Sequence, residues 1–173
     1  RARTLAASMA QEALAGLADT GGGVVGGSGE PMTVRELSDR IAEAAGELGI
    51  RVPVTVGSVA EHAEIPAAVA QAIIRASTQA IANGIQHADA RGLRVWAGLP
   101  VGVVRRGTAG VVSGVEVVIA DSGPGFDLRA IPEDRLGISA SIVARMSAVG
   151  GTAHISSDKI GTRVTLRWRG IGS

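Results

Sequence analysis

The chain has 173 residues, a formal net charge of +1 at pH 7 and no cysteine. This length suffices for one domain of ordinary size with a short appendage. The near-neutral charge gives no strong field that would attract nucleic acid or an anionic membrane, and the lack of cysteine excludes disulfides and thiolate chemistry. No apolar run approaches the ~20 residues that a helix needs to span a bilayer.

Two parts are expected along the chain. Residues 1–31 are predicted to form a helical tail, at residues 1–17, followed by a Gly-rich linker or loop. These glycines lack the G-K-[ST] pattern, so a phosphate-binding P-loop is not expected there. Residues 32–173 are predicted to form the domain.

The domain is predicted to mix helices and strands. Thr33 is a candidate N-cap with Glu36 as its capping-box partner, and the helix that follows is expected to end at Gly49. A long helix is expected from Pro66 to Ala88, and a last helix carries an apolar stripe over residues 138–149. Strands are predicted at residues 52–56, 93–99, 115–120, 153–156 and 162–168, with a turn region at 107–114 and a long connection at 121–135.

The order of these elements indicates the fold class. Strands that follow one another without a helix between them favour a mixed, mostly antiparallel sheet over a doubly wound one. In the last predicted strand Val164, Leu166 and Trp168 alternate with arginine and threonine, so one face of the sheet is expected to be buried and the other wet. The expected fold is an α/β two-layer sandwich with the helices on one face of the sheet.

A carboxylate followed by two glycines stands at the end of a predicted buried strand, in the run Asp121-Ser122-Gly123-Pro124-Gly125-Phe126. The strand would fix the carboxylate, while the glycines would let the backbone turn and let a ligand approach closely. An aspartate so placed can accept a hydrogen bond from an exocyclic amine such as that of adenine. The alternative is a plain turn.

Polar residues four apart line one side of the long helix, at Gln79, Asn83 and His87. Four residues rotate by about 400°, so the three form a slowly drifting line opposite an apolar stripe. Asparagine is a neutral oxygen donor suited to Mg²⁺, which keeps waters and phosphate oxygens in its shell. The alternative is a solvated helix face, and a lone histidine is more often a local hydrogen-bonding residue than a ligand.

A second polar cluster lies before the long helix, at Glu61, His62 and Glu64. Two carboxylates and an imidazole are the side chains that a metal-dependent hydrolase would use. The sequence favours a solvated loop at this place over such a site.

Together these segments resemble the ATP-binding domain of bacterial sensor histidine kinases, in the GHKL group with the Bergerat fold, and most of all the nitrate and membrane-fluidity sensors. Residues 75–88 look like the N box, and residues 121–127 look like the G1 box. Residues 135–151 look like the G2 region with its helix, and Gly161-Thr162 look like the Gly-Thr before the last strand. The resemblance covers residues 32–168.

The resemblance implies ATP and Mg²⁺ as cofactors and a role for each matching position. Asp121 would accept the adenine amino group, Gly125 would shape the adenine pocket, and Thr162 would support the hydrogen bonds there. Asn83 would ligate the Mg²⁺ that bridges the phosphates. Residues 126–136 would form a mobile ATP lid that meets the following helix at Gly137. The further candidate nucleotide contacts are His87, Gly123, Phe126 and Ile138.

Gln79 departs from the family pattern, which usually has glutamate there as a base or water-orienting group. An amide has no basic form near pH 7, so Gln79 occupies the catalytic position without supplying a base. Nothing like the phosphoacceptor pattern Arg-x-Leu-His-Asp occurs in residues 1–17. Nucleotide binding is therefore better supported than phosphoryl transfer.

The leading hypothesis is the ATP-binding catalytic module of a two-component sensor histidine kinase, which supplies the γ-phosphoryl to a histidine on a dimerisation domain not present in this chain. The alternatives are a non-catalytic nucleotide-binding or protein-interaction module and an anti-sigma-type serine kinase. The implied partners are the phosphoacceptor domain of the same or a partner protein and a response regulator. The implied localisation is the cytoplasm, including the cytoplasmic part of a membrane-anchored sensor.

Overall fold

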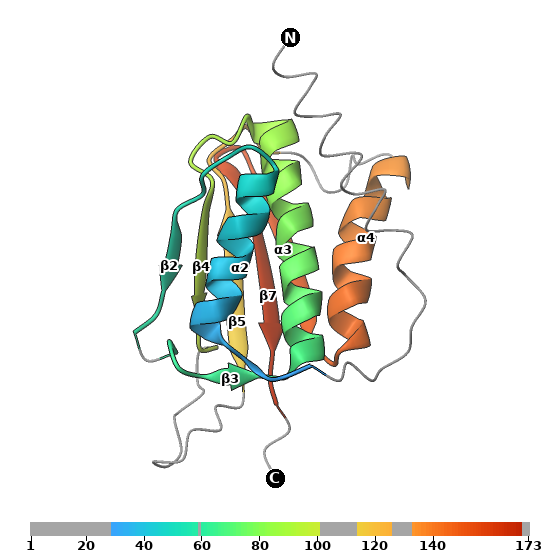
Figure 1. Ribbon diagram of the computed structural model, residues 1–173. Coiled ribbons are helices and arrows are strands. Elements are labelled where there is room, and N and C mark those ends of the chain that lie inside the picture. Colours follow the sequence, from blue (N-terminus) through green and yellow to red (C-terminus); the bar gives the residue numbers. More distant parts are fainter. Residues whose placement is uncertain (1–28, 59, 101–113, 126–132, 171–173) are drawn as a thin grey trace.

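The computed structural model describes residues 29–58, 60–100, 114–125 and 133–170. The predicted tail and most of the predicted linker, at residues 1–28, lie outside the described residues, as do Phe126 and nearly all of the turn region at residues 107–114. The described elements form two layers, with three helices side by side on one face of a sheet (Figure 1). The predicted two-layer α/β sandwich is confirmed.

A five-stranded sheet forms one layer. Its strand order is β2-β4-β5-β7-β6, in which β2 and β4 pair in parallel and the other neighbours pair antiparallel. The predicted mixed, mostly antiparallel sheet is therefore confirmed. The strands are β2 (Val54–Val56), β4 (Arg94–Gly98), β5 (Val115–Ala120), β6 (Thr152–Asp158) and β7 (Gly161–Trp168).

Three helices form the second layer: α2 (Val34–Glu47), α3 (Ala67–Ala88) and α4 (Glu133–Ala148). Alternate residues along each strand face these helices, and Ala97, Val117 and Leu166, which lie in one register row, are fully buried at 0% exposed. Burial of each large side chain of this kind contributes about 1.5–3 kcal/mol. The same core cluster contains helix residues Leu37, Ile41, Ile73, Ile81, Ile142 and Met146.

A small second sheet holds the beginnings of α2 and α3 together. β1 (Met32–Thr33) pairs antiparallel with β3 (Glu64–Ile65), a pairing that the sequence analysis does not predict. Beside it Arg35 forms an ion pair with Glu61. The hydrogen bond and charge of Arg35 hold the pKa of Glu61 below its ordinary value, so Glu61 has a structural partner.

Among the residues that the structure describes, no group of three or more histidine, cysteine or acidic side chains is placed to hold a metal ion. None of the described helices combines the length and the apolar character that crossing a bilayer requires.

The last helix begins earlier than the sequence analysis predicts. α4 starts at Glu133, so Gly137 and Ile138 lie inside the helix, and residues 133–136 are helical where the analysis places the end of a lid. The sequence contains a helix start signal at this place, because Pro132 precedes two acidic residues. Proline at a helix start and carboxylates in the first turn both favour a helix beginning here.

The predicted capping box at the start of α2 is confirmed. The Thr33 hydroxyl accepts the N–H of Glu36 at 3.2 Å, and the Glu36 carboxylate accepts the N–H of Thr33 at 2.8 Å. Two backbone donors that the helix itself leaves unpaired are thereby satisfied.

We expect Thr33→Ala to lower the free energy of unfolding by about 1 kcal/mol, because α2 loses its side-chain cap. Urea unfolding followed by circular dichroism measures the change. Ser147→Ala is the matched control, since it removes an exposed hydroxyl from α4, and it should change the stability by less than about 0.5 kcal/mol. Equal losses in the two variants would contradict the capping role.

Candidate functional site

Asp121 is held at the end of β5 by two backbone donors. Its Oδ1 accepts the N–H of Gly123 at 2.9 Å and the N–H of Thr162 on β7 at 3.2 Å. Its own N–H donates to the carbonyl of Thr162 at 3.0 Å. Among the described residues no group donates to Oδ2 of this half-buried side chain. One carboxylate oxygen is therefore anchored, and the other can accept a hydrogen bond from a ligand.

The loop after β5 is pressed between the end of α3 and the β6–β7 hairpin. A Cβ added at Gly123 would collide with Ala88, the last residue of α3. A Cβ at Gly125 would collide with the carbonyl of Asp158, and Gly125 also has a φ of +62° that favours glycine. Both glycines of the predicted motif are thus required by packing against the protein itself.

Thr162 supports this loop from β7. The backbone N–H and carbonyl of Thr162 both form hydrogen bonds with Asp121. The Thr162 hydroxyl also lies 2.9 Å from the hydroxyl of Ser157 on β6. The preceding residue, Gly161, has a φ of +148°, and a Cβ there would collide with the carbonyl of Asp121. The predicted Gly-Thr pair therefore lies directly against the predicted aspartate.

Gln79 joins α3 to α4. It is only 6% exposed, and its Oε1 accepts the hydroxyl of Ser141 at 2.7 Å and the guanidinium of Arg145 at 2.9 Å. The interpretation of the polar stripe as a solvated helix face is wrong at this position. The side-chain oxygen that the resemblance places near the reaction is bound by the neighbouring helix.

The contact between α3 and α4 carries positive charge. Desolvation by burial lowers the pKa of Arg145 from its ordinary value, and the charge of Arg75 lowers it further. Arg75 lies four residues before Gln79 on the same helix. Neither arginine has an ion pair within the described part of the chain. An anionic group at this end of the helices would therefore be stabilised.

Asn83 and His87 continue the stripe towards the end of α3. Asn83 is half-buried and His87 is exposed. A helix rises about 7.5 Å over the five residues from Asn83 to Ala88, and Ala88 packs against Gly123. Asn83 therefore lies on the part of α3 that approaches the Asp121 loop.

The structure brings some predicted site residues together and separates others. Asp121, Gly123, Gly125 and Thr162 form one cluster, with Asn83 and His87 on the neighbouring helix. Gln79 contacts α4 instead. Gly137 and Ile138 lie within α4, and Phe126 lies outside the described residues.

Sequence reasoning missed Ser141 and Arg145. Both lie on α4, more than sixty residues after Gln79 in the chain. No local spacing connects them to α3, because only the packing of the two helices does so. The signal that the sequence does contain is the position of Gln79 within a helix rich in alanine and isoleucine.

The fold matches that of histidine kinase ATP-binding domains. The ATP-binding domain of PrrB from Mycobacterium tuberculosis is 22% identical with a TM-score of 0.54, over 82% of this chain and 97% of that one. The histidine kinase AdeS from Acinetobacter baumannii is 15% identical with a TM-score of 0.60, over 98% of this chain and 76% of that one.

A third solved structure, full-length ShkA in complex with AMPPNP, is 18% identical with a TM-score of 0.63, over 99% of this chain and 37% of that one. No protein-family model and no curated protein sequence matches the chain. At these identities the likeness shows a shared fold, an α/β sandwich.

We expect Gln79→Ala to lower the free energy of unfolding by about 1–3 kcal/mol, because two donors on α4 lose their acceptor in a largely buried contact. Thr78→Ala is the matched control, since that hydroxyl bonds only the Ile74 carbonyl of its own helix, at 2.8 Å. The control should lose less than about 1 kcal/mol. Urea unfolding measures both, and equal losses would show that the bonds to Ser141 and Arg145 do not join the helices.

Proposed function

We propose that this chain is the ATP-binding catalytic module of a two-component sensor histidine kinase of the nitrate and membrane-fluidity sensor type. It would transfer the γ-phosphoryl group of Mg-ATP to a histidine on a separate dimerisation domain. A response regulator would then accept the phosphoryl group from that histidine, and both steps would take place in the cytoplasm. The observation that carries the proposal is the half-buried Asp121 carboxylate, anchored by two backbone donors with one oxygen left for a ligand.

At the adenine end, Asp121 acts as a fixed acceptor. Because Gly123 and Thr162 already hold Oδ1, Oδ2 receives the exocyclic amine without reorganising the loop. Guanine carries an oxygen where adenine carries this amine, and that oxygen would face a carboxylate. The geometry therefore favours ATP over GTP.

At the phosphate end, Asn83 is the residue that would hold Mg²⁺. Its amide oxygen suits a hard cation whose other ligands are water and phosphate oxygens. When bound, the ion would neutralise charge that develops on the phosphates. The chain's own residues would bind and orient the nucleotide, with Arg75 and Arg145 adding positive charge to the neighbouring helix contact.

A non-catalytic nucleotide-binding module is the second candidate, and Gln79 favours it. Its oxygen is bound by Ser141 and Arg145, and an amide cannot accept a proton near pH 7. In that case ATP would bind and shift the population of conformations, and no phosphoryl group would be transferred.

We expect Asp121→Asn to weaken ATP binding by about tenfold or more, because a charge-assisted hydrogen bond contributes about 1.5–3 kcal/mol. The preference for ATP over GTP should also narrow, since an amide can donate to the guanine oxygen. Titration of a fluorescent ATP analogue with Mg²⁺, and competition by ATP and GTP, measures both effects.

Asp39→Asn is the control for this experiment. Asp39 is an exposed carboxylate on α2, so its loss should leave ATP affinity within a factor of about two. Thermal unfolding verifies that both variants fold. If Asp121→Asn also stays within that factor, Asp121 does not bind adenine.

We expect the wild-type chain to phosphorylate a supplied dimerisation domain slowly, and Gln79→Glu to raise the rate by about a hundredfold, since a placed general base contributes about 10²–10⁴-fold. Transfer of a radiolabelled γ-phosphoryl group measures the rate, with EDTA as the blank. Gln79→Ala removes the contact with α4 without adding a base, so it shows how much the loss of this contact alone changes the rate. ATP binding without any wild-type transfer would support the non-catalytic module.

A further inference from the structure

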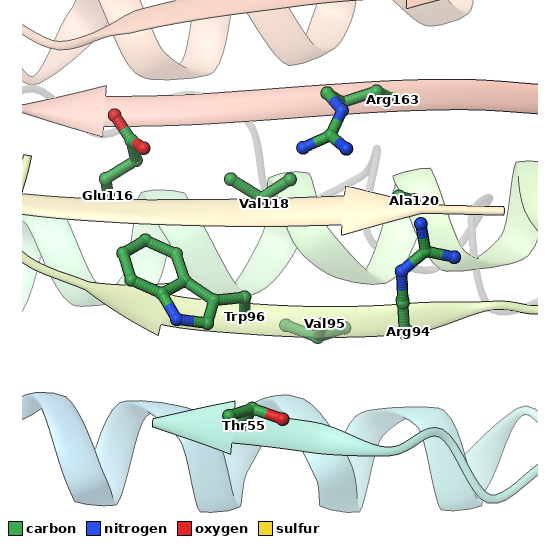
Figure 2. Close-up of a pocket in the computed structure, with 8 residues that line it drawn as sticks. All are labelled: Thr55, Arg94, Val95, Trp96, Glu116, Val118, Ala120 and Arg163. Atoms are coloured by element: carbon green, nitrogen blue, oxygen red, sulfur yellow. The ribbon is translucent and has the colours of Figure 1, made fainter. Parts of the chain in front are cut away.

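The face of the sheet that points away from the helices carries a shallow basin (Figure 2). Its volume is 430 Å³, and it is lined by Thr55, Arg94, Val95, Trp96, Glu116, Val118, Ala120 and Arg163. All of these residues belong to the adjacent strands β2, β4, β5 and β7. The basin therefore has a floor of strands and, within the described residues, no opposing wall.

Two arginines flank a small side chain at one end of the basin. Arg94 and Arg163 both pair in register with Ala120, from opposite sides of β5, and Figure 2 shows both guanidinium groups pointing toward that strand. Arg94 donates to the Gly92 carbonyl at 3.0 Å. In the described ranges neither guanidinium forms an ion pair. A carboxylate above Ala120 would accept hydrogen bonds from both.

The other end of the basin is apolar and fixed. Trp96 is 36% exposed, and its indole lies over Gly98, where any Cβ would collide with it. Val118 lies beside Trp96 in the register of β4 and β5. Glu116 is only 8% exposed and is neutralised by Arg167, whose Nε donates to it at 2.6 Å. The basin thus offers apolar surface next to two arginines that have no ion pair among the residues the structure describes.

Shape and charge select among the possible occupants. Small ligands are usually enclosed over most of their surface, which a basin without an opposing wall does not achieve. Nucleic acid relies on many phosphate contacts, whereas the described part of this face has two arginines without an ion pair, on a chain of net charge +1. A second copy of the chain would bring arginines against arginines.

We propose that this face docks an acidic segment of a partner protein. A carboxylate of that segment sits between Arg94 and Arg163, and a neighbouring apolar side chain packs on Trp96 and Val118. The proposal goes beyond nucleotide binding, because the basin lies on the face of the sheet opposite α3, and its test needs no nucleotide.

The experiment is calorimetric titration of the full chain with a short acetylated peptide of alternating aspartate and leucine. Wild type should bind it, and Arg163→Gln and Arg94→Gln should each weaken binding about five- to tenfold. Arg40→Gln is the matched control, because Arg40 is an exposed arginine on α2, on the other side of the sheet. It should change the affinity by less than about twofold.

Comparison probes decide what is recognised. Replacing aspartate with asparagine in the peptide, or leucine with serine, should each weaken binding, and raising the salt from about 0.05 M to about 0.5 M should weaken it further. Circular dichroism verifies that the variants are folded. No binding by wild type, equal loss in Arg40→Gln, unchanged binding of the asparagine peptide, or tighter binding of a thymidine oligonucleotide would each overturn the proposal.

Discussion

The two backbone N–H groups that hold Oδ1 of Asp121 fix the candidate site. One comes from the turn that Asp121 itself begins, and the other comes from β7, a neighbouring strand that lies far along the chain. β5 and β7 are interior strands of the sheet, with fully buried residues such as Val117 and Leu166. Because these strands are tightly packed, they restrict the position of the carboxylate. The glycines at 123, 125 and 161 then allow the loop, the hairpin and the end of α3 to approach as closely as this geometry demands.

Much of the fold could be predicted because its signals are local. The capping box at Thr33 and Glu36 is contained in four residues, and the strand alternation around Val164 and Leu166 repeats every second residue. The two-residue strands β1 and β3 are too short to carry any period, so they could not be found. At the candidate site, Asp121 and the Gly-Thr pair stand in short motifs and lie against each other in the structure, whereas the partners of Gln79 depend on how two helices pack.

Gln79 lies in a helix contact whose charges would affect the chemistry of any residue at this position. Arg145 and Arg75 make its surroundings positive, so a carboxylate at this position would find two nearby cations, while the amide satisfies Arg145 and Ser141 without adding a charge. A glutamate paired closely with Arg145 would have a lowered proton affinity, so its gain as a general base would fall at the lower end of the range such bases give, about a hundredfold. The arginines of α4 and α3 therefore bear on the reactivity of position 79 whichever residue stands there.

The open face of the sheet presents a different physical problem. Helices cover one face of the sheet and bury its apolar residues, and the candidate nucleotide site lies where β5, the β6–β7 hairpin and α3 meet. Neither the helix packing nor that candidate site accounts for the residues of the basin. Trp96 keeps an indole in contact with water, and two guanidinium groups lie on either side of Ala120 with no acidic partner among the described residues. Two guanidinium groups that flank one residue repel each other, and an exposed indole forgoes the free energy of its burial. A carboxylate with an apolar neighbour removes both costs at once, which is why an acidic segment accounts for this face better than solvent does.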